Sequence, residues 1–257
     1  MPFADARHGR PVNLQPLQVQ YQDYAIWQRD ELSGERLQAL KNDWIKQLSG
    51  VEPLELPTDH PRPATPSYRG DSVAFEIEPA LLQPFEQLCR SEGATLQMGL
   101  LALVALLLQR YSRQDDFAIG VPIWGRNHPD LEPLIGFFVN TLPIRCRFEG
   151  SRSFRQLLAQ VRDSSIAAYE HQELPFEQMV EVLQVERDIS RNPLVQVMLQ
   201  LLDLPEAVTS FVDGLELGEL PSGVEAAKFD LDWAFRRSAD QALQGSVTYA
   251  KIGRAHV

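Results

Sequence analysis

The sequence has little of several features that mark particular classes of protein. Two cysteines, Cys89 and Cys146, are too few for a disulfide framework and lack the spacing of a zinc site, which favours a reducing cytoplasm. The net charge is −11 and the Lys and Arg residues form no block, so we expect no nucleic-acid partner. The N-terminus also lacks the apolar segment of a secretion signal.

Long apolar runs are missing as well. The longest, from Met98 to Leu108, has about half of the roughly 20 residues that a membrane span needs. We therefore expect no membrane partner, and we predict that this run is a buried helix.

The common catalytic patterns are also absent. There is no glycine-rich dinucleotide or phosphate loop and no G-x-S-x-G nucleophile elbow. The pair Asp115 and Asp116 precedes a strand pattern and is interpreted as a solvated turn. No histidine is adjacent to another or four residues from another, so no metal site is expected; the five histidines are His8, His60, His128, His171 and His256.

The composition that remains is that of an ordinary globular protein, with 44% hydrophobic and 23% charged residues. Periodicity predicts a mixed sheet with helices packed on it. Ser33 is expected to cap the second helix, and Gly93 to end the third. The predicted helices are 16–32, 33–48, 79–93, 94–112, 153–172 and 174–184, and the predicted strands are 72–78, 115–123, 137–148, 194–203, 228–237 and 244–250.

Four stretches place polar residues in apolar surroundings. "GVPIWGR" ends a strand with Arg126, which is either a surface charge or a guanidinium that grips a carboxylate. "FVNT" carries Asn140 and Thr141 at the centre of an apolar strand pattern. "HQELPFEQM" joins His171 to the start of a helix. "RDISRNPLVQVML" leads Asn192 into a strand whose first residue is expected to be Pro193.

The last three of these stretches, preceded in the chain by "YQDYAIW", resemble in their order the core motifs of condensation domains in nonribosomal peptide synthetases. The series is "YQDYAIW", "IGFFVNTLPIR", "HQELPFE" and "RDISRNPL", and "LPTDHPRP" and "YRGDSVAFEI" fit between them. The resemblance extends from about Leu14 to Asp203. It implies a chloramphenicol-acetyltransferase-like α/β fold, mainly its C-terminal lobe, with a mixed sheet flanked by helices.

The resemblance also implies a reaction and its partners. An amine on one peptidyl carrier protein attacks a thioester on another carrier's phosphopantetheine arm and forms an amide. The expected partners are carrier domains on both sides and an adenylation domain, and no cofactor is bound directly.

The family's catalytic signature, His-His-x-x-x-Asp-Gly, is missing from the sequence. In the family this signature precedes the "YQDY" motif, so we expect its histidine upstream of Met1. We therefore name no catalytic residue within the chain, and we expect the chain alone to be inactive.

The missing signature suggests a fragment. We expect residues 1–50 to be the end of the N-terminal lobe with connecting helices, and 51–72 to be a proline-rich crossing segment. Residues 73–251 are expected to form the C-terminal lobe. Residues 252–257, "IGRAHV", resemble a translated sequencing adapter rather than part of the protein.

Family position implies roles for five residues, which are expected to line or support a tunnel. Arg126 is expected to pair with the missing signature Asp. Asn140 and Thr141 are expected near the lobe interface, with Asn140 bonded either to pantetheine amides or to a neighbouring strand. A structural hydrogen bond at a helix end is favoured for His171, and Asn192 is expected to open a strand beside the channel. The aromatic residues of "YQDYAIW" are expected to pack in the core.

Other functions stay open at this point. Epimerization and heterocyclization domains share the fold, as does a free-standing acyltransferase that uses coenzyme A, although the four motifs fit them less well. A second class of function is not enzymatic, namely a carrier-binding or structural half. "RRSAD" and "SRSFRQ" are candidate basic patches for carrier docking.

Overall fold

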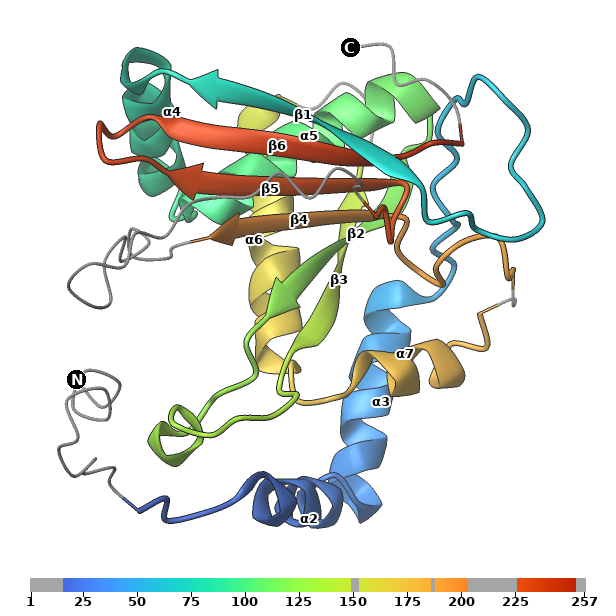
Figure 1. The fold of residues 1–257 in the computed structure, drawn as a ribbon, viewed down its shortest axis with the longest axis vertical. Coiled ribbons are helices and arrows are strands. Elements are labelled where there is room, and N and C mark those ends of the chain that lie inside the picture. The colour runs from blue at the N-terminus through green and yellow to red at the C-terminus, as the bar shows by residue number, and fades with distance from the viewer. Residues whose placement is uncertain (1–15, 149–152, 186–187, 203–225, 253–257) are drawn as a thin grey trace, which may run out of the picture.

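The computed structural model describes residues 16–148, 153–185, 188–202 and 226–252. Its centre is a six-stranded sheet in the order β1-β6-β5-β4-β2-β3, shown in Figure 1. The β4 strand is parallel to β2 and β5, and the remaining pairs are antiparallel, as the prediction of a mixed sheet requires. The strands are β1 (Gly70–Ile77), β2 (Asp116–Ile123), β3 (Asn140–Arg147), β4 (Val197–Leu202), β5 (Leu231–Arg237) and β6 (Leu243–Ala250).

Some expectations concern residues that lie outside these ranges. Met1 and His8 are among them, and so are residues 253–257, which include His256 and most of the adapter-like segment. The expected position of the signature histidine, upstream of Met1, therefore stays a prediction.

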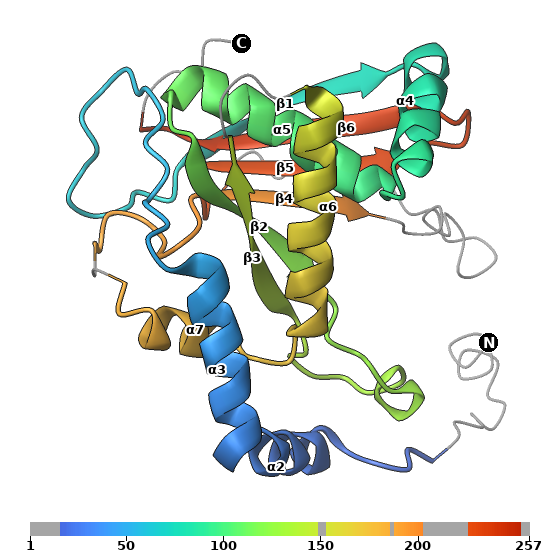
Figure 2. The same cartoon turned by 180° about the vertical axis from the view of Figure 1, so that it is seen from behind.

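Helices cover one face of the sheet. In Figure 2, α4, α5 and α6 lie in front of the strands, whereas α3 and α7 flank the lower end and α2 lies furthest from β1. All six predicted helices are present, so these predictions are confirmed. Their bounds are α2 (Tyr21–Glu31), α3 (Gly34–Leu48), α4 (Pro79–Ser91), α5 (Leu96–Ser112), α6 (Phe154–Glu170) and α7 (Phe176–Val182).

The main core lies between the helices and the sheet. The helix α5 supplies its centre, since seven of its residues are buried and its apolar side chains leave no polar face. The α3 residues Leu40, Trp44 and Leu48 belong to the same buried cluster. Residues of the segment expected at 1–50 therefore share one core with residues of the segment expected at 73–251.

Within the sheet, the neighbouring strands β2 and β4 approach each other closely at one residue pair. The only register pair between β2 and β4 among the described residues is Gly120 with Met198. A Cβ atom on Gly120 would lie 2.3 Å from the Met198 sulfur and 3.2 Å from a Val195 methyl group. The glycine is needed here because the Met198 side chain lies across the backbone of β2.

Side chains at the starts of β4 and β5, two interior strands, anchor the proline-rich segment. The backbone N–H of Leu54 donates to Gln196 Oε1 at 2.7 Å, and Arg62 forms a two-pronged ion pair with Asp230, just before β5. Before β1, this segment pairs with no strand of the described ranges, so side chains such as Gln196 satisfy backbone groups such as the Leu54 N–H. The strand β1 begins at Gly70, within the range expected for the crossing segment.

One local expectation holds only in part, and two were wrong. Ser33 is the N-cap residue of α3, as expected, but its hydroxyl donates back to the Asp30 carbonyl at 2.6 Å and makes no cap hydrogen bond. Pro193 does not open β4, which begins at Val197. Asn140 is not central in its strand but is the first residue of β3, because the apolar residues before it belong to a loop. Gly93, by contrast, follows α4 at a φ of 67°, as expected.

No single helix of the described ranges is long and apolar enough to cross a membrane. Only the pair α4 and α5 passes by length and composition, and it is bent by 104° at the break. The expected buried helix, α5, is confirmed.

Arg145 provides a test of the packing between β3 and α3. It is 8% exposed, it forms a two-pronged pair with Asp116 at 2.7 and 2.5 Å, and it donates to the carbonyls of Gln47 and Ser49. We expect Arg145→Met to lower the free energy of unfolding in urea by about 3 kcal/mol, because it breaks a buried pair. Arg147→Met, at an arginine with a 45% exposed side chain that lies 3.8 Å from Asp116, should change it by less than about 1 kcal/mol. Equal losses would contradict this assignment.

The two thiols provide a pH test. Complete burial raises the pKa of Cys146 to about 12, and burial also raises the pKa of Cys89. Because a folded thiol's pKa lies above that of the unfolded thiol, stability from this source is full below about pH 8.5 and is lost as the pH rises towards 12. We expect neither thiol to react with Ellman's reagent at about pH 8 until urea unfolds the chain. Rapid reaction of the native protein would show that the core is open.

Candidate functional site

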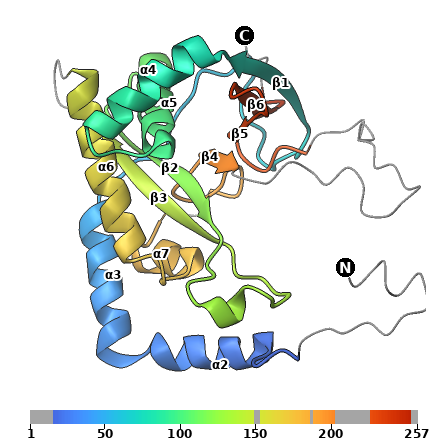
Figure 3. The ribbon, with the colours of Figure 1, turned by 90° about the vertical axis from the view of Figure 1, so that its left-hand side faces the viewer.

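A cavity of about 810 Å³ lies between α2, the loop before β3 and the turn from α6 to α7. Three of the four motif stretches form it: "YQDYAIW" as α2, "IGFFVNT" as the loop and the start of β3, and "HQELPFE" as the turn. Figure 3 shows α2 beneath the loop that connects β2 and β3. Residues far apart in the sequence thus surround one space of the size that small ligands occupy.

Tyr21 holds α2 against this loop. Its hydroxyl donates to the Phe137 carbonyl at 2.9 Å, and its ring meets Phe138 edge-on with centroids 5.1 Å apart. A Cβ atom on Gly136 would lie 2.1 Å from the Tyr21 ring, so only glycine permits this approach. Tyr21 and Phe138 belong, together with Leu131, to a second, smaller core.

The second core was not predicted in this form. The aromatic residues of "YQDYAIW" were expected to pack in the core, but α2 has no fully buried residue. Tyr21 and Tyr24 are half-buried in the small core, whereas Trp27 is 55% exposed and lines the cavity. The prediction was wrong for Trp27 because helical spacing identifies a face of a helix but not what covers it.

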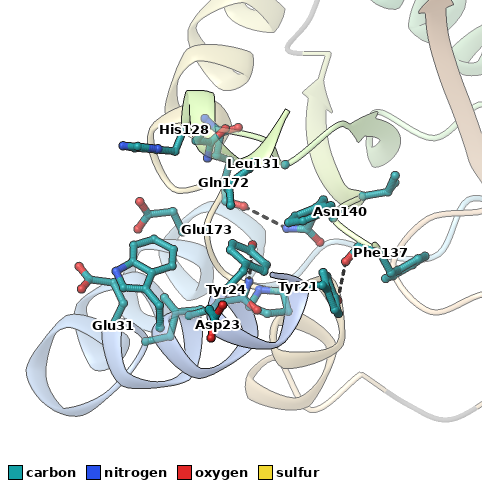
Figure 4. Close-up of a pocket in the computed structure, with 18 of the residues that line it drawn as sticks. Tyr21, Asp23, Tyr24, Glu31, His128, Leu131, Phe137, Asn140, Gln172 and Glu173 are labelled. Atoms are coloured by element: carbon teal, nitrogen blue, oxygen red, sulfur yellow. Dashed lines mark hydrogen bonds between the residues drawn. The ribbon is translucent and has the colours of Figure 1, made fainter. Parts of the chain in front are cut away.

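Asn140 binds the turn between α6 and α7. Its amide nitrogen donates to the carbonyls of Gln172 at 3.0 Å and Leu174 at 2.8 Å, and its oxygen accepts from the N–H groups of Thr141 and Phe176. A side-chain amide has two donor and two acceptor positions, and all are used. The amide therefore fixes the cavity wall and leaves no hydrogen bond for a ligand, as Figure 4 shows for its bond to Gln172.

Thr141 differs from its neighbour. Successive side chains of a strand point to opposite faces, so Thr141 lies on the face away from Asn140. Its methyl group lies near Gly120, and the residue lines the cavity. Of the pair, only the Thr141 hydroxyl has no partner within the described part of the chain.

His171 lies at the end of α6 and is held on all sides. Its Nδ1 is 2.7 Å from the Ala167 carbonyl, its Nε2 is 3.0 Å from an Asp43 carboxylate oxygen, and its own carbonyl accepts from Trp44 Nε1. These contacts tie α6 to α3. They are the contacts of a structural residue, and His171 is not among the residues that line the cavity.

Arg126 organises the loop before β3, which lines the cavity. Its guanidinium donates to the carbonyls of Leu131 at 3.2 Å and Leu134 at 3.1 Å and lies 4.4 Å from the centre of the Phe138 ring. Within the described ranges it meets no carboxylate. It is therefore not a free surface charge, and its place under Phe138 stabilises one wall of the site.

Asn192 lies elsewhere. It precedes β4 by several residues, and its amide donates to the Lys228 carbonyl at 2.5 Å. It lines a second cavity of about 580 Å³ together with Arg62 and Arg191, whose guanidinium groups are paired with Asp230, Glu55 and Asp188. The expectation that Asn192 opens the strand beside the channel was wrong, because β4 begins only at Val197.

The two candidate basic patches are largely paired. In "RRSAD", Arg237 forms an ion pair with Glu86 and Arg236 donates to Gln244 Oε1 at 3.3 Å. In the described part of "SRSFRQ", Arg155 forms an ion pair with Glu92. A carrier docking patch at either place stays a prediction.

The cavity of about 810 Å³ is acidic. Five carboxylates line it, and no Lys or Arg is among the described residues that do so; the five are Asp23, Glu31, Asp130, Glu173 and Glu177. Arg36, just outside, pairs with Glu31 and Glu173. Burial first, then Tyr21 and Glu173, raises the pKa of Tyr24. Sequence analysis did not single out these carboxylates because they come from separate elements.

The chemistry that the described residues offer is limited. They contain no cluster of His, Cys, Asp or Glu that could hold a metal ion. His128 lines the cavity at its edge, where its Nδ1 accepts from the Asp130 N–H at 3.3 Å. The arrangement can bind and orient a ligand.

Comparison with known proteins identifies the family. The condensation-domain family model matches residues 3–252, so the chain belongs to the condensation-domain family. It is 44% identical over 239 residues to a linear gramicidin synthase protein from Brevibacillus parabrevis, a match that covers 92% of this chain and 5% of that protein. Malpinin synthetase from Mortierella alpina is 41% identical over 250 residues, which are 94% of this chain and 3% of that protein. The expected resemblance to nonribosomal peptide synthetases is confirmed.

Solved structures agree on the fold. The X-domain from teicoplanin biosynthesis is 31% identical with a TM-score of 0.86, and the match covers 99% of this chain and 59% of that one. The X-domain in complex with OxyB gives a TM-score of 0.84 at 32% identity, covering 99% of this chain and 57% of that one. The expected α/β condensation-domain fold is therefore confirmed, and the chain spans less than two thirds of these relatives.

Asn140 provides a test of the wall. We expect Asn140→Asp to lower the free energy of unfolding by at least about 2 kcal/mol, because a carboxylate cannot donate to the Gln172 and Leu174 carbonyls. The control, Thr141→Val, changes the neighbouring residue. It keeps the shape of that side chain, replaces its hydroxyl by a methyl group, and should cost less than about 1 kcal/mol. Urea denaturation of both variants measures the difference. Similar losses would show that the amide does not hold the turn.

Proposed function

We propose that this chain is part of a condensation domain that forms an amide bond between two carrier-bound substrates in nonribosomal peptide synthesis. The observation that carries the proposal is the convergence of three family motifs on one cavity in a chain of that family. The proposed partners are peptidyl carrier domains on either side and an adenylation domain, and the substrates are carried on phosphopantetheine.

In the proposed reaction the acceptor amine attacks the donor thioester carbonyl. The C–N bond forms, the C–S bond breaks, and the proton of the amine leaves as the donor arm is released as a thiol. Most of the rate then comes from holding two tethered reactants at attack distance. The described residues would supply walls and orientation. The proposal requires a His-His-x-x-x-Asp-Gly motif upstream of Met1, since these 257 residues lack it.

The five motif residues then have different parts in the proposal. Thr141 faces the substrates with its hydroxyl, whereas Asn140 and His171 hold the elements that surround the cavity. Arg126 supports the loop and has one terminal nitrogen beyond its two carbonyl bonds, which is the group we propose for the signature Asp. Asn192 has no part in the cavity.

A second function is favoured by a specific observation. The X-domain of teicoplanin biosynthesis is 31% identical, and its structure in complex with OxyB is also similar. A chain with this likeness also suits a docking platform for another protein, without amide formation of its own.

A chimera tests the two functions. The chain is joined to the N-terminal lobe of a condensation domain that carries the double-histidine motif, and it is mixed with two aminoacyl-loaded carriers. We expect dipeptide on the acceptor carrier from the chimera and none from the chain alone. Replacing the second histidine of the motif by alanine should lower the rate by about 10²- to 10⁴-fold.

The control is the fold of the chimera, measured by urea denaturation. A chimera that folds cooperatively and forms no dipeptide would contradict the amide-forming function and favour the docking platform. Dipeptide from the chain alone would contradict the need for the double histidine.

A further inference from the structure

The charge of the cavity lining is one-sided. The chain has 24 Lys and Arg residues, yet none is among the described residues that line this space. Arg36 balances Glu31 and Glu173, but Asp23, Asp130 and Glu177 have no Lys or Arg partner in the described part of the chain. Carboxylates gathered around one hollow attract a cation.

Aromatic rings form the other part of the wall. Tyr24 and Trp27 lie with ring centroids 5.9 Å apart, and Trp27 is 55% and Phe137 77% exposed. Figure 4 shows Glu31, Glu173 and His128 on one side of the space and Tyr21, Phe137 and Asn140 on the other. A ring face beside a carboxylate binds a positively charged group that is joined to an apolar stem.

The size of the space limits the ligand. A volume of about 810 Å³ lies within the range of small-molecule sites, and the walls come from α2, the loop before β3 and the turn from α6 to α7. Asn140 has no free hydrogen bond for a ligand, so recognition falls to the other polar side chains of the lining, which include the carboxylates, Asn127 and the Thr141 hydroxyl.

We propose that this cavity binds the basic side chain, an ammonium or guanidinium group, of an amino-acid substrate. The inference rests on the proposed function, because a carrier-bound amino acid is the ligand that it names. The apolar stem of the side chain lies against Tyr24 and Trp27, and its charge lies among Asp23, Asp130 and Glu177. The cavity then selects substrates by charge, in addition to any role in amide formation.

Three small probes test this selection on the chain itself. They are the N-acetylcysteamine thioesters of Nα-acetyl-lysine, Nα-acetyl-norleucine and Nα-acetyl-glutamate, which differ in the charge and end of the side chain, the glutamate stem also being shorter. Titration calorimetry at low salt is expected to give an affinity for the lysine probe about tenfold above that for norleucine. The glutamate probe should bind most weakly, and the lysine advantage should shrink at high salt.

Matched variants locate the binding. Glu177→Gln should reduce the lysine advantage about threefold, whereas Glu181→Gln, one turn later on α7 and outside the cavity, should leave it unchanged. Trp27→Leu should weaken the lysine and norleucine probes alike, because the apolar stem of each lies against this ring. Urea denaturation of each variant checks that it is folded.

Equal affinity for lysine and norleucine, or an advantage that Glu177→Gln leaves intact, would overturn the proposal. The measurement needs no turnover. A chain that prefers the lysine probe while its chimera forms no dipeptide would therefore contradict the amide-forming function without affecting the cavity assignment.

Discussion

The site depends on the four hydrogen bonds of Asn140. One amide joins the first residue of β3 to the turn between α6 and α7, and each of its donor and acceptor positions has a backbone partner. In a partly buried amide with every hydrogen bond made, the loss of one bond leaves a polar atom without its partner and costs stability. The strand, the turn and the cavity between them therefore keep one geometry.

A second set of contacts completes the cavity from the other side. Tyr21 lies over Gly136, donates to the Phe137 carbonyl and packs edge-on against Phe138. Arg126 donates to two carbonyls of the same loop. The α2 helix is thus attached through a small core of its own rather than through the main one. Motifs that lie 116 residues apart in the chain become neighbours by this contact.

Much of the fold could be predicted because local patterns determine it. Periodicity located every helix and strand that the structure describes, apart from one short 3₁₀ turn, and glycine after α4 marked its end. The predictions failed where the hydrogen-bond partner of a side chain determines the local structure. Ser33 occupies a cap position but bonds to Asp30, and Asn192 precedes a strand but bonds to Lys228. Neither partner follows from spacing, because each is selected by the path of the backbone.

The sequence by itself determined the family, the mixed α/β architecture and the four motif stretches, because motif order and apolar periodicity are properties of the chain. Only the tertiary structure decided which stretches meet. It brought three of them to one acidic, aromatic cavity and left the fourth beside another. It also gave Asn140 and Thr141 different surroundings. Adjacent strand residues point to opposite faces, so the Asn140 amide reaches the turn and the Thr141 hydroxyl does not.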